Sequence, residues 1–405
     1  MSPFTTRPVI IGRHGVVTSG HYLATAAGFR IIDQGGNAID AAAAMSFCLN
    51  LLEPQSCGIG GEVPLLIYSA KEQKTFAISG IGWSPLSFTT DWCKENTIDL
   101  IPGDGYLPAC VPAVVGTWAL ALARFGTMSF TQILQPAIDL AENGYPMYQR
   151  LRDRLYTHLN RYLELYPTTG EVYCPGGMPP EVGEIFTNPD FANTLKTMCN
   201  AETNAKHKGR ITGIEAARAA FYEGSISETI VQFISDNPVE DASGRVHKGL
   251  LQDLDFAGWQ AEIEAPISLQ HNDLDIHKCS SWTQGPTFLQ QLNILKNFNL
   301  KDLGHNSADY LHIWIESAKL AFADREAYYG DPHFDQVNWD ILLSDEYSQS
   351  RSNLIGTEAS LDMRPGLAGN QIPSYALQPV GADNRLSLEL EASIIKDLGL
   401  GHANI

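Results

Sequence analysis

The chain has 405 residues, of which 44% are hydrophobic and 18% charged, which is ordinary for a globular protein with a large core. With 46 acidic and 27 basic residues its formal net charge is −19, so it lacks the basic face that nucleic-acid binding requires, and anionic membrane surfaces would repel it. No stretch approaches the roughly 18 uninterrupted apolar residues that a membrane-spanning helix needs.

Cysteine usage and the first residues both favour a cytoplasmic location. The seven cysteines are odd in number and include no C-x-x-C pair, which is typical of reduced, mostly buried thiols. The only apolar run near the start, Val9 to Ile11, is too short for a signal peptide.

Hydrophobic periodicity predicts a mixed α/β chain with a helix-rich second half. The elements expected in its first half are a strand at 9–19, a helix at 22–34 closed by two glycines, an alanine-rich helix over 39–52, hairpin strands at 64–68 and 75–79, helices at 114–125 and 130–143, and an amphipathic pattern at 150–166. No internal repeat is found, and a chain of this length could hold one large domain or two to three ordinary ones.

The second half begins with a loop at 173–189 that is rich in glycine and proline. The polar, non-periodic stretch 201–210 is interpreted as an exposed insertion. The remaining expected elements are two helices within 213–236, a strand at 274–278, and long helices at 286–297 and 306–329.

Residues 35–61, GGNAIDAAAAMSFCLNLLEPQSCGIGG, are the most informative stretch. The helix is apolar nearly all round, which indicates burial. The glycine-rich turn from Cys57 to Gly61 brings bare main chain close to a neighbour. A tight helix-to-strand connection within a core would account for the same pattern.

The same stretch resembles the start of the large subunit of γ-glutamyltranspeptidases, which are N-terminal-nucleophile hydrolases. Further blocks in the family's order extend the resemblance over most of the chain: 12–20, 24–28, 125–128, 135–137, 142–144, 221–226, 292–295, 304–309, 321–325 and 330–332. The resemblance implies a four-layer αββα sandwich, one domain completed by a separate small subunit.

The resemblance also implies an amide hydrolase or acyltransferase that forms an acyl-enzyme on a threonine. That threonine must be the first residue of a chain, because its own α-amino group is the general base, and self-cleavage of a precursor creates this terminus. No Thr-Thr-His-like segment follows Gly366, so no catalytic residue is expected here, and the nucleophile is expected to begin a small subunit after Ile405. The expected assembly is a heterodimer or a dimer of heterodimers. A truncated chain or a non-catalytic scaffold would explain the same absence.

Three predicted substrate-binding residues lie where relatives carry Arg-Glu-x-Ala-Pro, whose arginine, by the resemblance, clamps the α-carboxylate of the glutamyl group. Aligned on Pro85, this chain has Ile81 for the arginine and Gly82 for the glutamate. Isoleucine cannot form a bidentate pair with a carboxylate, and losing that pair costs about 2–5 kcal/mol. Glutathione is therefore not the expected donor unless the partner supplies a cation. Trp83 offers a flat apolar wall and one N–H, which suits a neutral acyl group, although a core role explains it equally.

Two further substrate-binding residues are predicted beside glycine turns. Glu62 stands where relatives have a small residue, and could either contact substrate or accept backbone N–H groups. Gln284 precedes a helix that has Pro286 near its start, where free N–H groups would face an anion or a carbonyl. A plain helix start explains this second turn equally well.

The predicted substrate is thus a small-molecule amide, and no cofactor is implied. A β-lactam side-chain acylase and an oxamate-type amidohydrolase are alternatives within the family. The grouping of His271, His277 and Cys279 is not interpreted as a metal site, because ligands so placed usually lack the required geometry. Asp324 and Arg325 are expected to form a buried structural pair by resemblance, or a surface ion pair by spacing alone.

Overall fold

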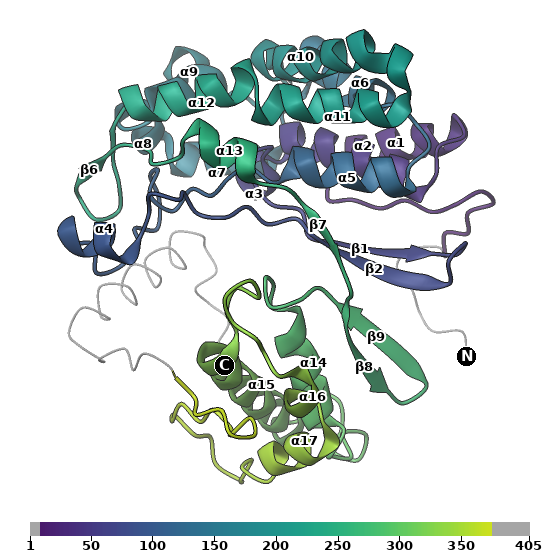
Figure 1. The fold of residues 1–405 in the computed structure, drawn as a ribbon, viewed down its shortest axis with the longest axis vertical. Helices are drawn as coiled ribbons and strands as arrows, with labels where there is room; N and C mark the ends of the chain where they lie inside the picture. The colour runs from purple at the N-terminus through teal and green to yellow at the C-terminus, as the bar shows by residue number, and fades with distance from the viewer. Residues whose placement is uncertain (1–8, 375–405) are drawn as a thin grey trace. The chain divides into compact units, whose positions relative to one another are not determined.

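A computed structural model describes residues 9–374, which form two compact units (Figure 1). The first unit comprises residues 9–266 and 277–280, and the second comprises residues 267–276 and 281–374. Within these residues no helix combines the length and apolarity needed to cross a bilayer. A single domain over 1–405 stays a prediction, as do the four-layer sandwich and the separate small subunit.

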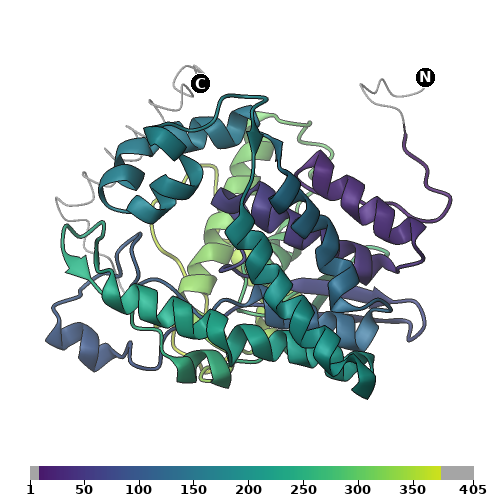
Figure 2. The ribbon, with the colours of Figure 1, turned by 90° about the horizontal axis from the view of Figure 1, so that it is seen from above.

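The first unit is mainly helical. Its helices are α1 (Tyr22–Asp33), α2 (Ala38–Leu52), α3 (Pro54–Cys57), α4 (Thr90–Glu95), α5 (Val114–Phe125), α6 (Phe130–Asn143), α7 (Gln149–Thr157), α8 (Leu159–Glu164), α9 (Pro167–Tyr173), α10 (Pro189–Ala205), α11 (Arg210–Tyr222), α12 (Ser225–Asp236) and α13 (Asp253–Gly258). Helix α2 packs on α1, α5 and α6, and α11 packs on α10 and α5. Figure 2 shows α1, in purple, at the edge of this bundle.

A small antiparallel sheet lies against one side of the bundle, where α5 contacts β2. It consists of β1 (Leu65–Ser69), β2 (Lys74–Ser79) and β7 (Glu262–Glu264) in the order β1-β2-β7. In the β1–β2 hairpin Leu65 lies opposite Ile78. Two-residue strands pair elsewhere as β3 (Tyr145–Pro146) with β4 (Ile185–Phe186), and as β5 (Val239–Glu240) with β6 (Val246–His247).

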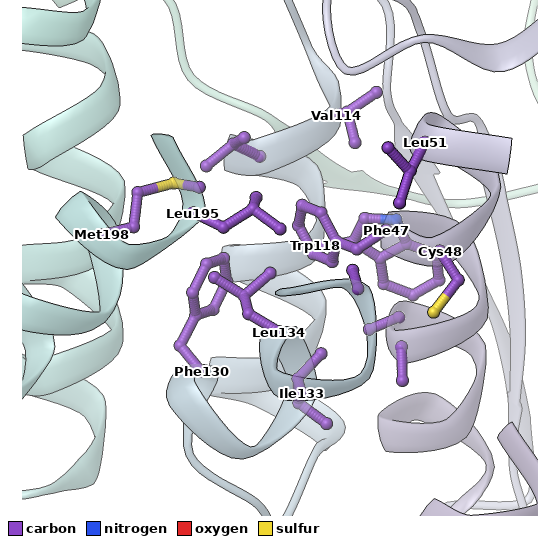
Figure 3. Close-up of a cluster of buried hydrophobic side chains, with 14 of the residues drawn as sticks. Phe47, Cys48, Leu51, Val114, Trp118, Phe130, Ile133, Leu134, Leu195 and Met198 are labelled. Atoms are coloured by element: carbon purple, nitrogen blue, oxygen red, sulfur yellow. The ribbon is translucent and has the colours of Figure 1, made fainter. Parts of the chain in front are cut away.

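The core of the first unit lies between α2, α5, α6 and α10. Figure 3 shows its large side chains, which include Phe47, Trp118, Phe130 and Leu195. The predicted burial of the alanine-rich helix is confirmed, since alanines on α2 are fully buried and bring α1 and α5 close. Asn37 caps this helix, and its Asp40 accepts Thr127 N (3.0 Å), which ties α2 to the α5–α6 turn.

The second unit holds α14 (Gly285–Leu295), α15 (Ala308–Tyr328), α16 (Trp339–Leu342) and α17 (Asp345–Ser352), with a hairpin of β8 (Ile267–His271) and β9 (Leu274–Lys278). Asp324 on α15 is fully buried and lies 3.3 Å from a guanidinium nitrogen of Arg351. Burial is the main cause that raises the pKa of Asp324. The expected buried pair of Asp324 with Arg325 is wrong, because Arg325 is partly exposed and forms a surface ion pair with Glu326, as the spacing alone suggested.

Three of the expected elements differ from the structure. Residues 9–19 form no strand, because no other described segment pairs with them, and Val9, Ile10 and Ile11 are 80%, 80% and 87% exposed. The pattern at 150–166 is two helices that break at His158, where ψ is 15°.

Residues 201–210 are mostly exposed, as expected, but they are largely helical and form no separate insertion. Helix α10 runs to Ala205, and the buried carboxylate of Glu202 accepts Phe130 N (2.7 Å) and Thr131 N (2.6 Å) at the start of α6. Arg210 donates to Leu122 O (3.1 Å). Glu202 and Arg210 thus bond to neighbouring helices, whereas residues 203–204 and 206–209 are exposed.

We predict that Glu202→Ala destabilises the protein by about 2–4 kcal/mol, because two backbone N–H groups would lose their acceptor. Urea unfolding measures this change. Glu171→Ala on α9, where the side chain is exposed, is the matched control and should change stability by less than about 0.5 kcal/mol. Equal effects of the two substitutions would contradict the capping role.

Candidate substrate-binding site

Three of the predicted substrate-binding residues lie in the extended segment 80–83, which continues directly from β2. Both ends of this segment are hydrogen-bonded to neighbouring chain. Gly80 O accepts Val63 N (2.8 Å), and Trp83 O accepts Val111 N (3.0 Å). The chain before β1 and the chain before α5 therefore hold this segment in place.

Glycine is required where these backbones meet. A Cβ on Gly82 would lie 1.7 Å from Val111 O, and one on Gly80 would lie 2.1 Å from Val63 O. Both distances are far inside van der Waals contact, so no other residue fits without moving the main chain. The glycines set how closely the three segments approach.

Helix α13 braces the same segment from the other side. Its buried Asp255 accepts Leu86 N (2.8 Å) and Gln252 N (2.7 Å), and Trp259 Nε1 donates to Ile81 O (3.1 Å). Sequence reasoning missed Asp255 and Trp259, because they lie far from residues 80–83 in the chain and belong to no recognisable motif. Their contacts fix the main chain of Ile81 and leave its side chain half-buried.

Trp83 forms a hydrogen bond within the chain and also exposes part of its ring. Its Nε1 donates to Asp255 O (3.2 Å), so the N–H that was expected to be available to substrate is already used within the chain. One edge of the indole lies over Gly258, where a Cβ would be 3.3 Å from the ring. The side chain is nevertheless 39% exposed, so part of the ring remains open as an apolar surface.

Glu62 lies on the neighbouring segment, between Gly61, whose O accepts Ala113 N (3.0 Å), and Val63. It is exposed, and within the described residues its carboxylate accepts no hydrogen bond and forms no ion pair. The predicted bonds to the glycine turn are therefore not formed. Burial, and then the nearby Glu62 carboxylate, raise the pKa of the Cys110 thiol.

Gln284 belongs to the second unit, where it is exposed and directly precedes α14. It occupies the N-cap position, but its side chain does not cap the helix. The neighbouring Gly285 N donates to Thr283 Oγ1 (3.0 Å). A role for Gln284 in binding substrate stays a prediction, as does that of each residue above.

The segments that form the candidate site supply no basic side chain. Hollows of about 910 and 740 Å³ lie elsewhere, lined by residues 336–341 with 368–371 and by residues 14–18 with parts of α1 and α2. The segments 60–64, 80–85 and 110–113 contain no lysine, arginine or histidine. The arrangement therefore offers an apolar face and a carboxylate, and it does not offer a clamp for an anion.

No three His, Cys, Asp or Glu side chains of residues 9–374 are grouped as a metal ion would require. The Cys279 thiol instead forms a hydrogen bond within the protein: its Sγ donates to Leu65 O (3.5 Å). The segments of the site likewise hold no serine or threonine apart from Ser84, and no base beside it. These residues can therefore bind and orient a substrate, and they supply no nucleophile with a base beside it.

Comparison with known proteins places the chain in a family. A family model described as gamma-glutamyltranspeptidase matches residues 24–379. The glutathione hydrolase-like YwrD proenzyme of Bacillus subtilis (strain 168) is 31% identical over 388 residues, with 95% of this chain and 65% of that protein covered. The acylase ACY 1 proenzyme of Pseudomonas sp. (strain V22) is 30% identical over 370 residues, with 89% and 62% covered.

A solved structure agrees with these matches. The crystal structure of Helicobacter pylori gamma-glutamyltranspeptidase has a TM-score of 0.76 at 26% identity, with 93% of this chain and 100% of that chain covered. The chain spans less than two thirds of the length of the two proenzymes.

We predict that Gly82→Ala destabilises the protein by at least about 2 kcal/mol, because the added Cβ would overlap Val111 O. Gly60→Ala is the matched control, since a Cβ there would meet nothing within 4 Å. Denaturant unfolding of both variants measures the difference. Tolerance of alanine at position 82 would show that the segments do not approach this closely.

Proposed function

The chain belongs to the γ-glutamyltranspeptidase family, and from this premise we propose that it is the acyl-binding part of an amide hydrolase or acyltransferase. Its partner would be a small subunit from the same precursor, which begins with the nucleophilic threonine. The match over residues 24–379 is the observation that carries this proposal.

The extent of the matches supports a two-part enzyme. The proenzymes named above extend well beyond the 65% and 62% of their length that match here. By contrast, the matched chain of the Helicobacter pylori enzyme is covered in full. A nucleophile in a separate part of the precursor agrees with both observations, and with the absence of a Thr-Thr-His-like segment after Gly366.

The chemistry would follow that of other N-terminal threonine nucleophiles. The threonine hydroxyl attacks the amide carbonyl while its own α-amino group accepts the proton, and the leaving amine departs with a proton. Backbone N–H groups of the small subunit stabilise the tetrahedral oxyanion. Water or an amine then releases the acyl group. The residues described here would bind and orient that acyl group.

A substrate without an α-carboxylate is the second part of the proposal, and Ile81 is the observation that favours it. The half-buried Ile81 and the exposed face of Trp83 form an apolar wall, and no cation lies in the segments around them. An acylase or a small-amide hydrolase fits this wall better than an enzyme that takes free γ-glutamyl donors. Acylase ACY 1, named above, shows that the family includes acylases.

We predict that the full precursor, expressed with its coding sequence downstream of Ile405, matures into two chains. Intact-mass measurement should find a smaller fragment that begins with threonine, and replacement of that threonine by alanine should abolish both cleavage and turnover. A lone 44.4 kDa chain with no companion would instead support a non-catalytic scaffold.

We predict that the mature enzyme hydrolyses pentanoyl-p-nitroanilide at least tenfold faster, in kcat/KM, than γ-glutamyl-p-nitroanilide, an order-of-magnitude expectation from the missing guanidinium. Ile81→Arg should raise kcat/KM for the γ-glutamyl substrate, because the new guanidinium can pair with its α-carboxylate. Ile81→Leu, which adds no charge, is the control. Efficient γ-glutamyl turnover by the unaltered enzyme would refute the assignment of Ile81.

A further inference from the structure

We propose that Glu62 makes this site selective for acyl groups that carry an ammonium group and no carboxylate, an inference that rests on the function proposed above. Glu62 would attract the ammonium group and repel a carboxylate bound in the same place. Glu62 is then a specificity-determining residue and takes no part in bond breaking.

The strand register places Glu62 beside Ile81. In the β1–β2 ladder Leu65 lies opposite Ile78, and the bond from Val63 N to Gly80 O continues that register beyond the ladder. The next pair along these segments is Glu62 and Ile81. Residues directly opposite in neighbouring extended segments have Cβ atoms about 5 Å apart on one face. An acyl group that lies on Ile81 therefore comes within reach of the Glu62 carboxylate.

The carboxylate has no partner in the described part of the chain. Glu62 is exposed and forms no hydrogen bond or ion pair with residues 9–374. The segments 60–64, 80–85 and 110–113 contain no basic residue that could neutralise it. Burial, and then the Glu62 carboxylate, raise the pKa of the Cys110 thiol, and Val111, the next residue, donates to Trp83 O. A ligand's ammonium group would supply the missing partner.

Two other roles for Glu62, a cap of the glycine turn and a surface ion pair, do not agree with the observed contacts. A carboxylate that caps the glycine turn would accept its N–H groups, yet Gly61 N donates to Gly58 O (2.9 Å) and Val63 N donates to Gly80 O. A surface ion pair would need a cation, and none contacts Glu62 among the described residues. The charge is thus left available beside the site.

The test compares three ligands of equal chain length on the mature two-chain enzyme: 5-aminopentanamide, pentanamide and 4-carboxybutanamide. Calorimetry gives their dissociation constants without need for turnover. The unaltered protein should bind the ammonium ligand about tenfold more tightly than the carboxylate ligand, as Coulomb attraction over a few ångströms of partly exposed surface suggests.

Glu62→Gln should abolish that preference, while Glu228→Gln, an exposed residue on α12, should leave it unchanged. Thermal unfolding of each variant establishes that it is folded. A preference that persists in folded Glu62→Gln would overturn the proposal, and so would failure of all three ligands to bind. Binding with the expected preference but no hydrolysis of any amide would contradict the proposed function and leave the selectivity of Glu62 supported.

A second pair of variants tests the placement of Glu62 beside position 81. In Ile81→Arg alone, the new guanidinium should pair with Glu62 and improve binding of 4-carboxybutanamide only modestly. The double variant Ile81→Arg with Glu62→Gln should bind it about tenfold more tightly than the single variant. Equal affinities would show that the two side chains do not meet, and the proposal would fail.

Discussion

The close approach of main chain at Gly82 and Val111 is the constraint on which the candidate site depends. A Cβ on Gly82 would lie 1.7 Å from Val111 O, so the two segments meet backbone to backbone. This contact fixes residues 80–83 between the chain that leads into β1 and the chain that leads into α5. Because Ile81 and Trp83 flank that glycine, their orientation follows from it.

Several buried acidic side chains of this chain stabilise its fold by accepting backbone N–H groups. Asp40, Glu202 and Asp255 each accept backbone N–H groups from a distant segment, and each stabilises a helix start or a turn. Asp40 and Glu202 also accept the hydroxyl groups of Thr127 and Thr131. The acidic side chain that lacks such a partner at the candidate site is the exposed Glu62, which is why we interpret its charge as directed at a ligand.

Much of the fold was predictable from local pattern. The capped, alanine-rich α2 and the amphipathic α6 combine end signals with helical periodicity, and both were expected close to their observed limits. The predictions that differ from the structure concern residues whose structure depends on segments far away in the chain. Val9 to Ile11 has the composition of a strand but no neighbour to pair with among the described residues. Glu202 is polar yet buried, because it accepts N–H groups at the start of α6.

The candidate site was predictable only in part, and for the same reason. The departure at Ile81 could be found from a motif, whereas the hydrogen bond from the Trp83 N–H to Asp255 O joins residues 172 positions apart.

The most direct test is to treat the mature protein with a p-nitrophenyl ester of pentanoic acid and to locate the trapped acyl group by mass spectrometry. We expect the pentanoyl mass on the N-terminal threonine fragment of the companion chain. Acylation confined to the 44.4 kDa chain, or none at all, would contradict the division of labour proposed here.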